Sequence, residues 1–224
     1  MHARAEHLRK LIRGAKAALE SFEDDLVFAG SDVMGLYVLR PAGPALRTTK
    51  DVDCITTVPG AQHAIKLGKL VMAGTLTPER DVLCRYRSST GDFIVDVLDL
   101  LGTTTGGNNR WFGPAVDQAG WWDAGGGIRV RAITPPYFVL TKLVSLQDGR
   151  RTEGHALYHH DLIDIVTVLT EVADFQVMAL PLLADLRREV ETLCGIAKDL
   201  EPDLIVDACH AEASVKPLLE WLGF

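Results

Sequence analysis

The apolar residues of this chain change their spacing several times along its first half. Between residues 8 and 22 they recur at helical intervals, and the short apolar stretch DLVFAG at 25–30 follows. This order predicts an amphipathic helix that leads into a short strand. A brief helix is expected over residues 31–37, before the proline- and glycine-containing stretch RPAGPALR at 40–47 forms a loop.

The following segments alternate between strand and helix patterns. The stretch RTTKDVDCITTV, residues 47–58, has the apolar and β-branched residues of a strand, and a second helix is expected over 61–73. Two alternating runs, 81–88 and 93–100, are joined by the turn-forming residues STGD. This combination predicts a β-hairpin.

The last part of the chain changes to helical spacing. The stretch LGTTTGGNNR, residues 101–110, predicts a loop at the rim of a site, residues 111–124 are weakly helical, and IRVRAIT at 128–134 is a last strand. From residue 135 onward the apolar repeats are all helical. We therefore predict a mixed α/β core with a small mixed sheet over residues 1–134, followed by an all-helical domain over 135–224.

Composition is that of an ordinary globular chain. Of the 224 residues 47% are apolar and 24% are charged, and no apolar run approaches the roughly 18 residues of a membrane span. The net charge of −7 disfavours a surface that coats nucleic acid, while a local basic groove stays compatible with RNA or a nucleotide. We expect a cytoplasmic protein without a membrane partner, whose four scattered cysteines are reduced core residues.

Three aspartates interrupt the predicted strands. Asp51 and Asp53 are two residues apart, so their side chains point to one face of a strand, and Asp96 lies inside a later strand. A buried carboxylate is costly unless it is paired or ligates a cation. An isolated D-x-D is most often a solvent-facing strand edge or a turn, but three aspartates within apolar strands favour a cation site.

The residues around these aspartates indicate which ligand they bind. Carboxylate oxygens suit Mg²⁺ or Mn²⁺, whereas zinc would require histidine or cysteine. Gly30 and Ser31 stand where a predicted strand passes into a helix, so backbone N–H groups and a hydroxyl are available to a phosphate. A phosphate cradle and a metal clamp are the two parts that phosphoryl transfer needs.

Several of these stretches resemble a known family. AGSDVMGLYV, TTKDVDCIT and FIVDVLDL resemble the Gly-Ser, D-x-D and third-Asp elements of the DNA-polymerase-β-like nucleotidyltransferase superfamily. NNRWF, TPPYFVLTKLVSLQDGR and HHDLIDIVTVL are similar to the abortive-infection type nucleotidyltransferases that act as toxins in bacterial toxin–antitoxin pairs. The resemblance covers residues 26–169; this chain departs from it in a longer segment between Ser31 and Asp51 and in the histidine-rich GHALYHH.

The resemblance implies a two-metal transfer of a nucleoside monophosphate from a nucleoside triphosphate (NTP). Asp51 and Asp53 would hold the metals that bridge the phosphates, while Asp96 would ligate the metal that faces the attacking hydroxyl and help to deprotonate it. Gly30 and Ser31 would bind the β and γ phosphates.

The helical domain would complete this site. The resemblance implies that Lys142 supplies positive charge to the triphosphate and that Asp161 belongs to the nucleotide site. Asp161 and Asp164 share a helix face and would orient Lys142 or arginine partners. Two structural alternatives stay open. Lys142 would also suit a snorkelling lysine on an amphipathic helix, and Asp161 a charge that balances a helix dipole.

Other polar and aromatic residues are weaker candidates. His155, His159 and His160 lack a third zinc ligand, and Asp99 is expected on the strand face opposite Asp96. Three tryptophans are assigned to the core: Trp111, Trp121 and Trp122.

Two classes of function follow from the sequence. The first is an Mg²⁺-dependent nucleotidyltransferase that modifies RNA, in particular tRNA, or a protein, and that acts as a growth-inhibiting toxin; a cognate antitoxin would be a further partner. A small-molecule (antibiotic) nucleotidyltransferase is a variant of this class. The second is a non-catalytic binding module with the same fold. Three costly carboxylates favour the enzyme.

Overall fold

The computed structural model describes residues 3–38, 46, 49–58, 60–100, 109–147, 155–199 and 222, and for 155–159 and 194–199 only the backbone. The chain divides into two compact units. Unit 1 comprises Met1–Pro41, Leu46–Asn108 and Phe112–Thr134, and unit 2 comprises Ala42–Ala45, Asn109–Trp111 and Pro135–Phe224.

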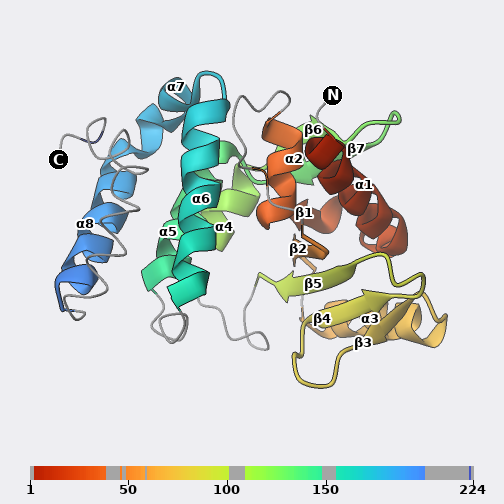
Figure 1. Ribbon diagram of the computed structural model, residues 1–224. Coiled ribbons are helices and arrows are strands. Elements are labelled where there is room, and N and C mark those ends of the chain that lie inside the picture. The colour runs from red at the N-terminus through yellow and green to blue at the C-terminus, as the bar shows by residue number, and fades with distance from the viewer. Residues whose placement is uncertain are drawn as a thin grey trace. The chain divides into compact units, whose positions relative to one another are not determined.

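Unit 1 is built on a seven-stranded mixed sheet with the order β3-β4-β5-β2-β1-β7-β6 (Figure 1). The strands are β1 (Leu26–Phe28), β2 (Asp51–Thr56), β3 (Leu76–Pro78), β4 (Arg85–Ser88), β5 (Ile94–Asp99), β6 (Gly120–Asp123) and β7 (Arg129–Ala132). The pairs β2–β5 and β1–β7 are parallel, and the other neighbours are antiparallel. The predicted mixed α/β class is therefore confirmed.

The two central strands β2 and β5 have one apolar face and one acidic face. Val52 and Cys54 of β2 and Val95 and Val97 of β5 are all fully buried, because alternate residues of a strand point to the same side. The alternate residues of these strands include Asp51, Asp53 and Asp96, whose side chains point to the other side of the sheet. The three aspartates thus lie on the face of the sheet opposite Val52, Cys54, Val95 and Val97.

Helices pack around this sheet. They are α1 (Ala3–Ala18), α2 (Met34–Tyr37), α3 (Gly60–Met72) and α4 (Phe112–Asp117), with the 3₁₀ turns η1 (Glu20–Asp25) and η2 (Ser31–Val33). The apolar stripe of α1, with Leu8, Ile12 and Ala15, is buried, as its helical spacing predicts. α3 lies against β3, and the ring of its His63 packs edge-on against Phe22 of η1, with 5.9 Å between the centroids.

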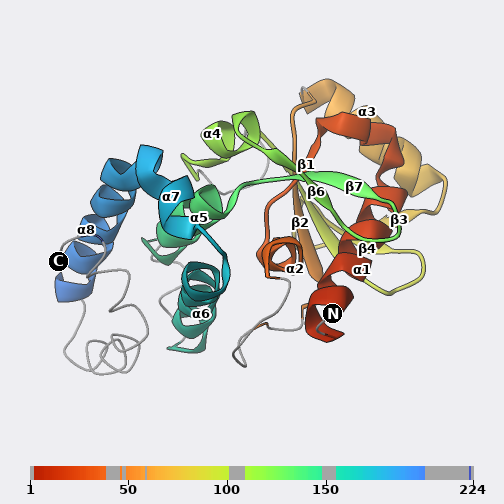
Figure 2. The same ribbon diagram turned by 90° about the horizontal axis from the view of Figure 1, so that it is seen from above.

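The contact between α1 and α2 depends on a glycine. A Cβ on Gly35 would lie 2.6 Å from the Cβ of Leu8 and 3.0 Å from the backbone oxygen of Ala5. This close approach lets the Nε of Arg9 donate a hydrogen bond of 2.7 Å to the Gly35 carbonyl oxygen. Figure 2 shows the two helices side by side. Since η2 and α2 follow Gly30 directly, this packing helps to position the predicted phosphate-binding turn.

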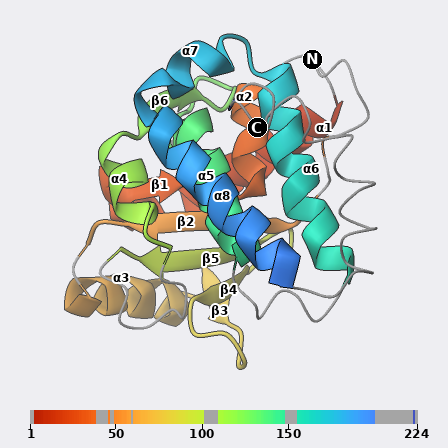
Figure 3. The ribbon, with the colours of Figure 1, turned by 90° about the vertical axis from the view of Figure 1, so that its left-hand side faces the viewer.

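The described part of unit 2 beyond Pro135 is helical, as predicted. Its elements are α5 (Pro135–Gln147), α6 (His155–Glu171), α7 (Phe175–Ala179), the 3₁₀ turn η4 (Leu180–Leu182) and α8 (Leu183–Asp199). Helix α5 contacts α6, α7 and α8 (Figure 3). It is therefore the central helix of the unit, which explains why its sequence is apolar on most sides.

Within the described residues, no single helix has the length and apolar character to cross a membrane. One pair of segments, His160–Glu171 and Phe175–Leu193, meets both criteria only when taken together, with a bend of 112° between them.

The structure corrects the expected elements in three places. Residues 111–124 are not helical throughout: α4 ends at Asp117, and β6 then pairs antiparallel with β7 through a turn of three glycines, Gly125 to Gly127, all with positive φ. The short β3 and α7 were not predicted, because each has too few residues to show a period of its own. Most of the predicted loops at 40–47 and 101–110, and of the final helical segment predicted from 202 to 222, lies outside the described residues.

The packing of α1 on α2 can be tested with a matched pair of glycine substitutions. We expect Gly35→Ala to lower the free energy of unfolding by about 1–3 kcal/mol, because the added methyl group overpacks the contact with Leu8. Gly68→Ala in α3 is the control: nothing lies within 4 Å of its Cβ position, so helix propensity should raise stability by up to about 1 kcal/mol. Urea unfolding measures both, and equal effects would contradict the close contact.

Candidate functional site

The strand register of unit 1 brings two of the three predicted aspartates side by side. In the parallel pair of β2 and β5, Asp53 is the direct partner of Asp96, so their side chains leave the sheet on the same face. Asp51 lies two residues earlier on that face. Carboxylates from two strands and 43 residues apart in sequence therefore converge, as a cation site requires.

Gly30 lies directly against this acidic face. A Cβ on Gly30 would fall onto the Asp53 carboxylate, 2.7 Å from its Cγ, and 2.7 Å from Oδ1 of Asp32. The backbone holds the two segments together, because Ala29 N–H donates to the Asp53 carbonyl oxygen at 2.9 Å. Only glycine fits between these carboxylates, and Ser31, half-buried, is its neighbour in the chain. The predicted Gly-Ser turn and D-x-D strand thus meet in space.

Asp32 is a member of this group that the sequence analysis did not single out. Its side chain is fully buried, and its Oδ1 accepts a long hydrogen bond of 3.4 Å from the Asp53 backbone N–H. Burial, and then the charge of Asp32, raises the pKa of the Tyr37 hydroxyl well above its usual value. The signal for Asp32 was present in the sequence: an acidic residue directly after Gly-Ser, inside the otherwise apolar stretch SDVMGLYV.

Arg85 of β4 is the basic residue of the site, and it too was missed. It is the direct partner of Asp96 in the antiparallel β4–β5 pair. Its guanidinium donates to both carboxylate oxygens, Nε to Oδ1 at 2.8 Å and Nη2 to Oδ2 at 2.7 Å. The hydrogen bond to Asp96 is the main cause of a raised Arg85 pKa; partial burial acts to lower the pKa, and the charges of Asp96, Asp51 and Asp53 act to raise it.

Pairing the predicted hairpin by register would have found this arginine, because directly opposed residues of a hairpin share a face.

The expectation of three buried carboxylates is corrected in part. Asp51 is exposed at the start of β2, Asp53 is half-buried, and the Asp96 side chain is 13% exposed but paired. The cost of burying Asp96 is thus offset by Arg85. Among the residues that the structure describes, no group of three or more acidic, histidine or cysteine side chains is arranged to hold a metal ion.

The remaining donor set still suits one hard cation. Mg²⁺ is commonly held by one or two carboxylates together with substrate phosphates. Asp51 and Asp53 can provide these carboxylates. The negative charge of this region also affects Cys54, whose side chain lies on the other side of the sheet. Burial, and then the charges of Asp32, Asp53 and Asp96, raises the pKa of the Cys54 thiol. A site with this much negative charge favours a cationic ligand.

Asp99 lies on the opposite face of β5, as expected. It is buried beside α3, where its Oδ2 is 3.4 Å from the position of a Cβ on Gly60. Burial lowers the pKa of the nearby His63, and the Asp99 charge acts against this shift. Asp99 therefore belongs to the packing of α3 and not to the acidic face.

Lys142 is the centre of an ion-pair cluster in unit 2. Its Nζ lies 2.6 Å from Oδ1 of Asp161 and 2.9 Å from Oδ2 of Asp164, both on α6. The Lys142 side chain is only 13% exposed, and Asp164 is fully buried. Burial acts to lower the Lys142 pKa, but the charges of Asp164 and Asp161 outweigh it and raise the pKa.

This geometry rules out a snorkelling lysine, because the ammonium group is paired inside the unit instead of reaching solvent. The predicted pairing of Asp161 and Asp164 with Lys142 is present. A contact between Lys142 and a triphosphate stays a prediction.

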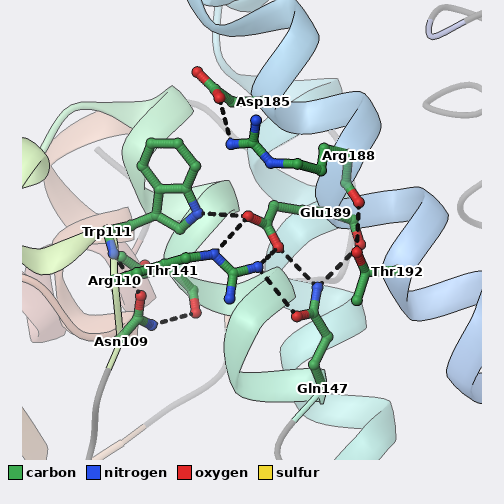
Figure 4. Close-up of polar contacts among 9 residues, drawn as sticks. All are labelled: Asn109, Arg110, Trp111, Thr141, Gln147, Asp185, Arg188, Glu189 and Thr192. Carbon is green, nitrogen blue, oxygen red and sulfur yellow. Dashed lines mark hydrogen bonds and ion pairs between the residues drawn. The ribbon is translucent and has the colours of Figure 1, made fainter.

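The stretch NNRWF, which the resemblance includes, attaches its own segment to the helices of unit 2 (Figure 4). Glu189 of α8 is completely buried and accepts hydrogen bonds from the Arg110 guanidinium, from the Trp111 indole at 2.9 Å and from Gln147 at 2.9 Å. Asn109 donates to the Thr141 carbonyl oxygen of α5 at 2.8 Å. These residues therefore have a structural role that the sequence did not indicate.

The other weak candidates have mixed outcomes. Trp111 is buried as expected, whereas Trp121 is 46% exposed and lies under the Arg129 guanidinium at 5.6 Å, so its assignment to the core is wrong. Cys54 is a buried free thiol and Cys84 a partly exposed one. The side chains of His155, His159, Cys194 and Cys209 lie outside the described residues.

Among the solved structures similar to this chain are two of similar extent. One is an antigenic nucleotidyltransferase-like protein from Paracoccidioides brasiliensis, with a TM-score of 0.49 and 15% identity over 84% of this chain and 92% of the other. The second is the antibiotic-resistance factor ANT(2'')-Ia, with a TM-score of 0.44 and 13% identity over 78% of this chain and 94% of the other. No protein-family model and no curated protein matches the chain.

Both TM-scores are below 0.5, so the function of this chain has to be inferred from its own residues.

The Glu189 cluster predicts a pH-dependent contribution to stability. Burial acts to raise the Glu189 pKa, but hydrogen bonds from Gln147, Arg110 and Trp111 outweigh it and lower the pKa. The stabilisation is therefore complete above the ordinary glutamate pKa of about 4.3 and is lost as the pH falls through the lowered native value. We expect Glu189→Gln to cost about 2–4 kcal/mol at pH 7, and the difference from wild type to narrow below pH ~4.

The matched control is Asp185→Asn, which removes an exposed ion pair with Arg188 on the same helix and should cost no more than about 0.5 kcal/mol. Urea unfolding across the pH range gives both values. A gap between Glu189→Gln and wild type that does not change with pH would contradict the ionised, buried carboxylate.

The Lys142 cluster gives a second stability prediction. Replacing Lys142 with Gln leaves Asp161 and Asp164 buried without their cation, so we expect a loss of about 3 kcal/mol or more. Lys69→Gln, on an exposed position of α3, is the control and should change little. If thermal and urea unfolding of the two variants were alike, the cluster would not contribute to stability.

Proposed function

We propose that this protein is a nucleotidyltransferase, which moves a nucleoside monophosphate from an NTP to an acceptor hydroxyl with the help of Mg²⁺ or Mn²⁺. The observation that carries the proposal is the contact of Gly30 with the Asp53 carboxylate. It joins the turn suited to a phosphate with the strand suited to a cation, and phosphoryl transfer needs both at one place.

Each residue of the group has a role in this proposal. Asp51 and Asp53 hold the cation through their carboxylate oxygens, and Ser31 and the backbone N–H groups after Gly30 contact the phosphates. When bound, the cation neutralises the charge that develops on the transferring phosphoryl group. Asp96, the partner of Asp53 on the next strand, would ligate the cation that faces the attacking hydroxyl and would accept the proton of that hydroxyl.

We also propose that Lys142 and Asp161 bind the nucleotide. Two carboxylates hold the Lys142 ammonium group and so fix its orientation. This role rests on the resemblance of the helix sequence and on the raised pKa of Lys142, which keeps the side chain positively charged.

For the acceptor we propose RNA, in particular tRNA, or a protein, and for the biological role a growth-inhibiting toxin with a cognate antitoxin. The resemblance of the motifs to abortive-infection type nucleotidyltransferases is the support for this choice. A small-molecule acceptor and a non-catalytic binding module are the alternatives. The acidic face favours catalysis over simple nucleotide binding, because carboxylates without a cation repel a triphosphate.

One labelling experiment tests the proposal and sorts the acceptors. The protein is incubated with each α-³²P-labelled NTP, with Mg²⁺ or Mn²⁺, and with total RNA, a cell extract or a panel of aminoglycosides. Label in RNA, in protein or in a small product identifies the acceptor class. Tight NTP binding without transfer to any of them would favour the binding module.

The matched variants are Asp53→Asn and Asp81→Asn. Asp53→Asn should lower the transfer rate by about 100-fold or more, because a cation ligand is lost, and should leave stability unchanged or slightly higher since one of two neighbouring like charges is removed. Asp81 is exposed in the turn before β4, and its replacement should leave the rate unchanged. Full activity of Asp53→Asn would refute the cation site.

A further inference from the structure

Arg85 stands out because it holds a proposed catalytic carboxylate by both of its oxygens. The pair is bidentate, with donor–acceptor distances of 2.8 and 2.7 Å, and the two residues are direct partners across the β4–β5 ladder. A planar guanidinium fits a carboxylate in this way with little loss of freedom. Arg85 therefore fixes the orientation of the Asp96 carboxylate.

The same pair limits what Asp96 can do. A carboxylate whose two oxygens both accept from Arg85 has to give up at least part of that pair in order to ligate a cation. The Arg85 side chain is 30% exposed and the Asp96 side chain 13%, so the guanidinium lies on the solvent side of the pair. Arg85 can thus leave Asp96 without disturbing the sheet backbone, whose ladder bonds do not involve the side chain.

The balance of charge indicates where Arg85 would go. Asp51 and Asp53 of β2 lie on the same face of the sheet as Asp96, the strand partner of Arg85, so Arg85 stands beside a group of three carboxylates. A cation bound to the nucleotide would take over neutralisation of these carboxylates and would also bring phosphate oxygens to the same face. A guanidinium binds phosphate with the same two-pronged geometry as carboxylate.

We propose that Arg85 is a positioning residue that exchanges partners: it holds Asp96 in the free protein and moves to an anionic phosphate oxygen when the cation and NTP bind. This inference rests on the proposed function and adds to it a residue outside the recognised motifs. In the free protein Arg85 competes with the cation for Asp96, and in the complex it contributes to nucleotide affinity.

Competition for Asp96 weakens binding of the cation, whereas the contact with phosphate strengthens binding of the nucleotide. Both effects can be measured without turnover. Calorimetry is used with Mn²⁺ alone, and then with Mn²⁺ together with a non-hydrolysable NTP analogue. For Arg85→Gln we expect Mn²⁺ alone to bind about tenfold more tightly, because its competitor is gone, and the analogue to bind about tenfold more weakly. The control is Arg87→Gln. Arg87 is on the same strand as Arg85 and forms an exposed ion pair with Glu79, so its replacement should change neither the Mn²⁺ affinity nor the analogue affinity.

A purely structural role for the pair predicts a different result. If Arg85 only tied β4 to β5, its loss would weaken both binding steps or neither, and either outcome overturns the proposal. Arg85→Lys keeps the charge but not the fork and should show both shifts to a smaller degree; it serves if Arg85→Gln does not fold.

Asp53→Asn separates this inference from the proposed function. If Mn²⁺ and the analogue bind the wild type and Asp53→Asn weakens them, the cation site stands, and the Arg85 variants alone decide the exchange. If Asp53→Asn binds both ligands as the wild type does, the proposed function fails, and the inference fails with it.

Discussion

The parallel pairing of β2 with β5 is the constraint on which the candidate site depends. It places Asp53 directly beside Asp96, although the two residues carry like charges. Their repulsion is tolerated because Arg85 neutralises Asp96 from the next strand and because Gly30 leaves room for the Asp53 carboxylate. A one-residue slip of β5 would turn Asp96 into the apolar core and move Val95 and Val97 to the acidic face.

Buried charge is handled differently in the two units. In unit 2 Glu189 is matched by Arg110 and by two neutral donors, so its charge is balanced within its own cluster. In unit 1 the Arg85 guanidinium pairs with Asp96, while Asp51 and Asp53 lie on the same face of the sheet and Asp32 is buried next to Asp53. The first arrangement contributes to stability. The second leaves an excess of negative charge on one face of a sheet, which is typical of a site that binds a cation.

The same comparison shows how structural and functional residues can share one motif. NNRWF lies within the resemblance to nucleotidyltransferases, yet Arg110 and Trp111 bond to a buried glutamate of α8. Lys142 is both a proposed phosphate contact and the cation of a buried cluster. The two aspartates fix the position of this lysine, and their hydrogen bonds to it offset the free-energy cost of burying the three charges.

Local sequence patterns were sufficient for the elements whose periods are long enough to be recognised. The helical spacing of α1, the alternation of β2 and β5 and the apolar run of α5 each specify the buried face of one element. For the same reason the shared face of Asp51 and Asp53 was predictable, because it depends only on the two-residue period of a strand. The short β3, β6 and α7 were not, since three to five residues form an element only when a neighbour supplies the pairing or packing.

The sequence by itself therefore determined the class of the fold, the amphipathic elements and the acidic character of one strand face. Only the tertiary structure decided which residues meet that face. Gly30, Asp32, Asp53, Arg85 and Asp96 come from four separate segments, and their contacts depend on strand order and register. Strand order and register follow from burial of the whole core, a global property that no local period contains. The pairing of Asp96 with an arginine, where a cation alone had been expected, is the clearest result of that difference.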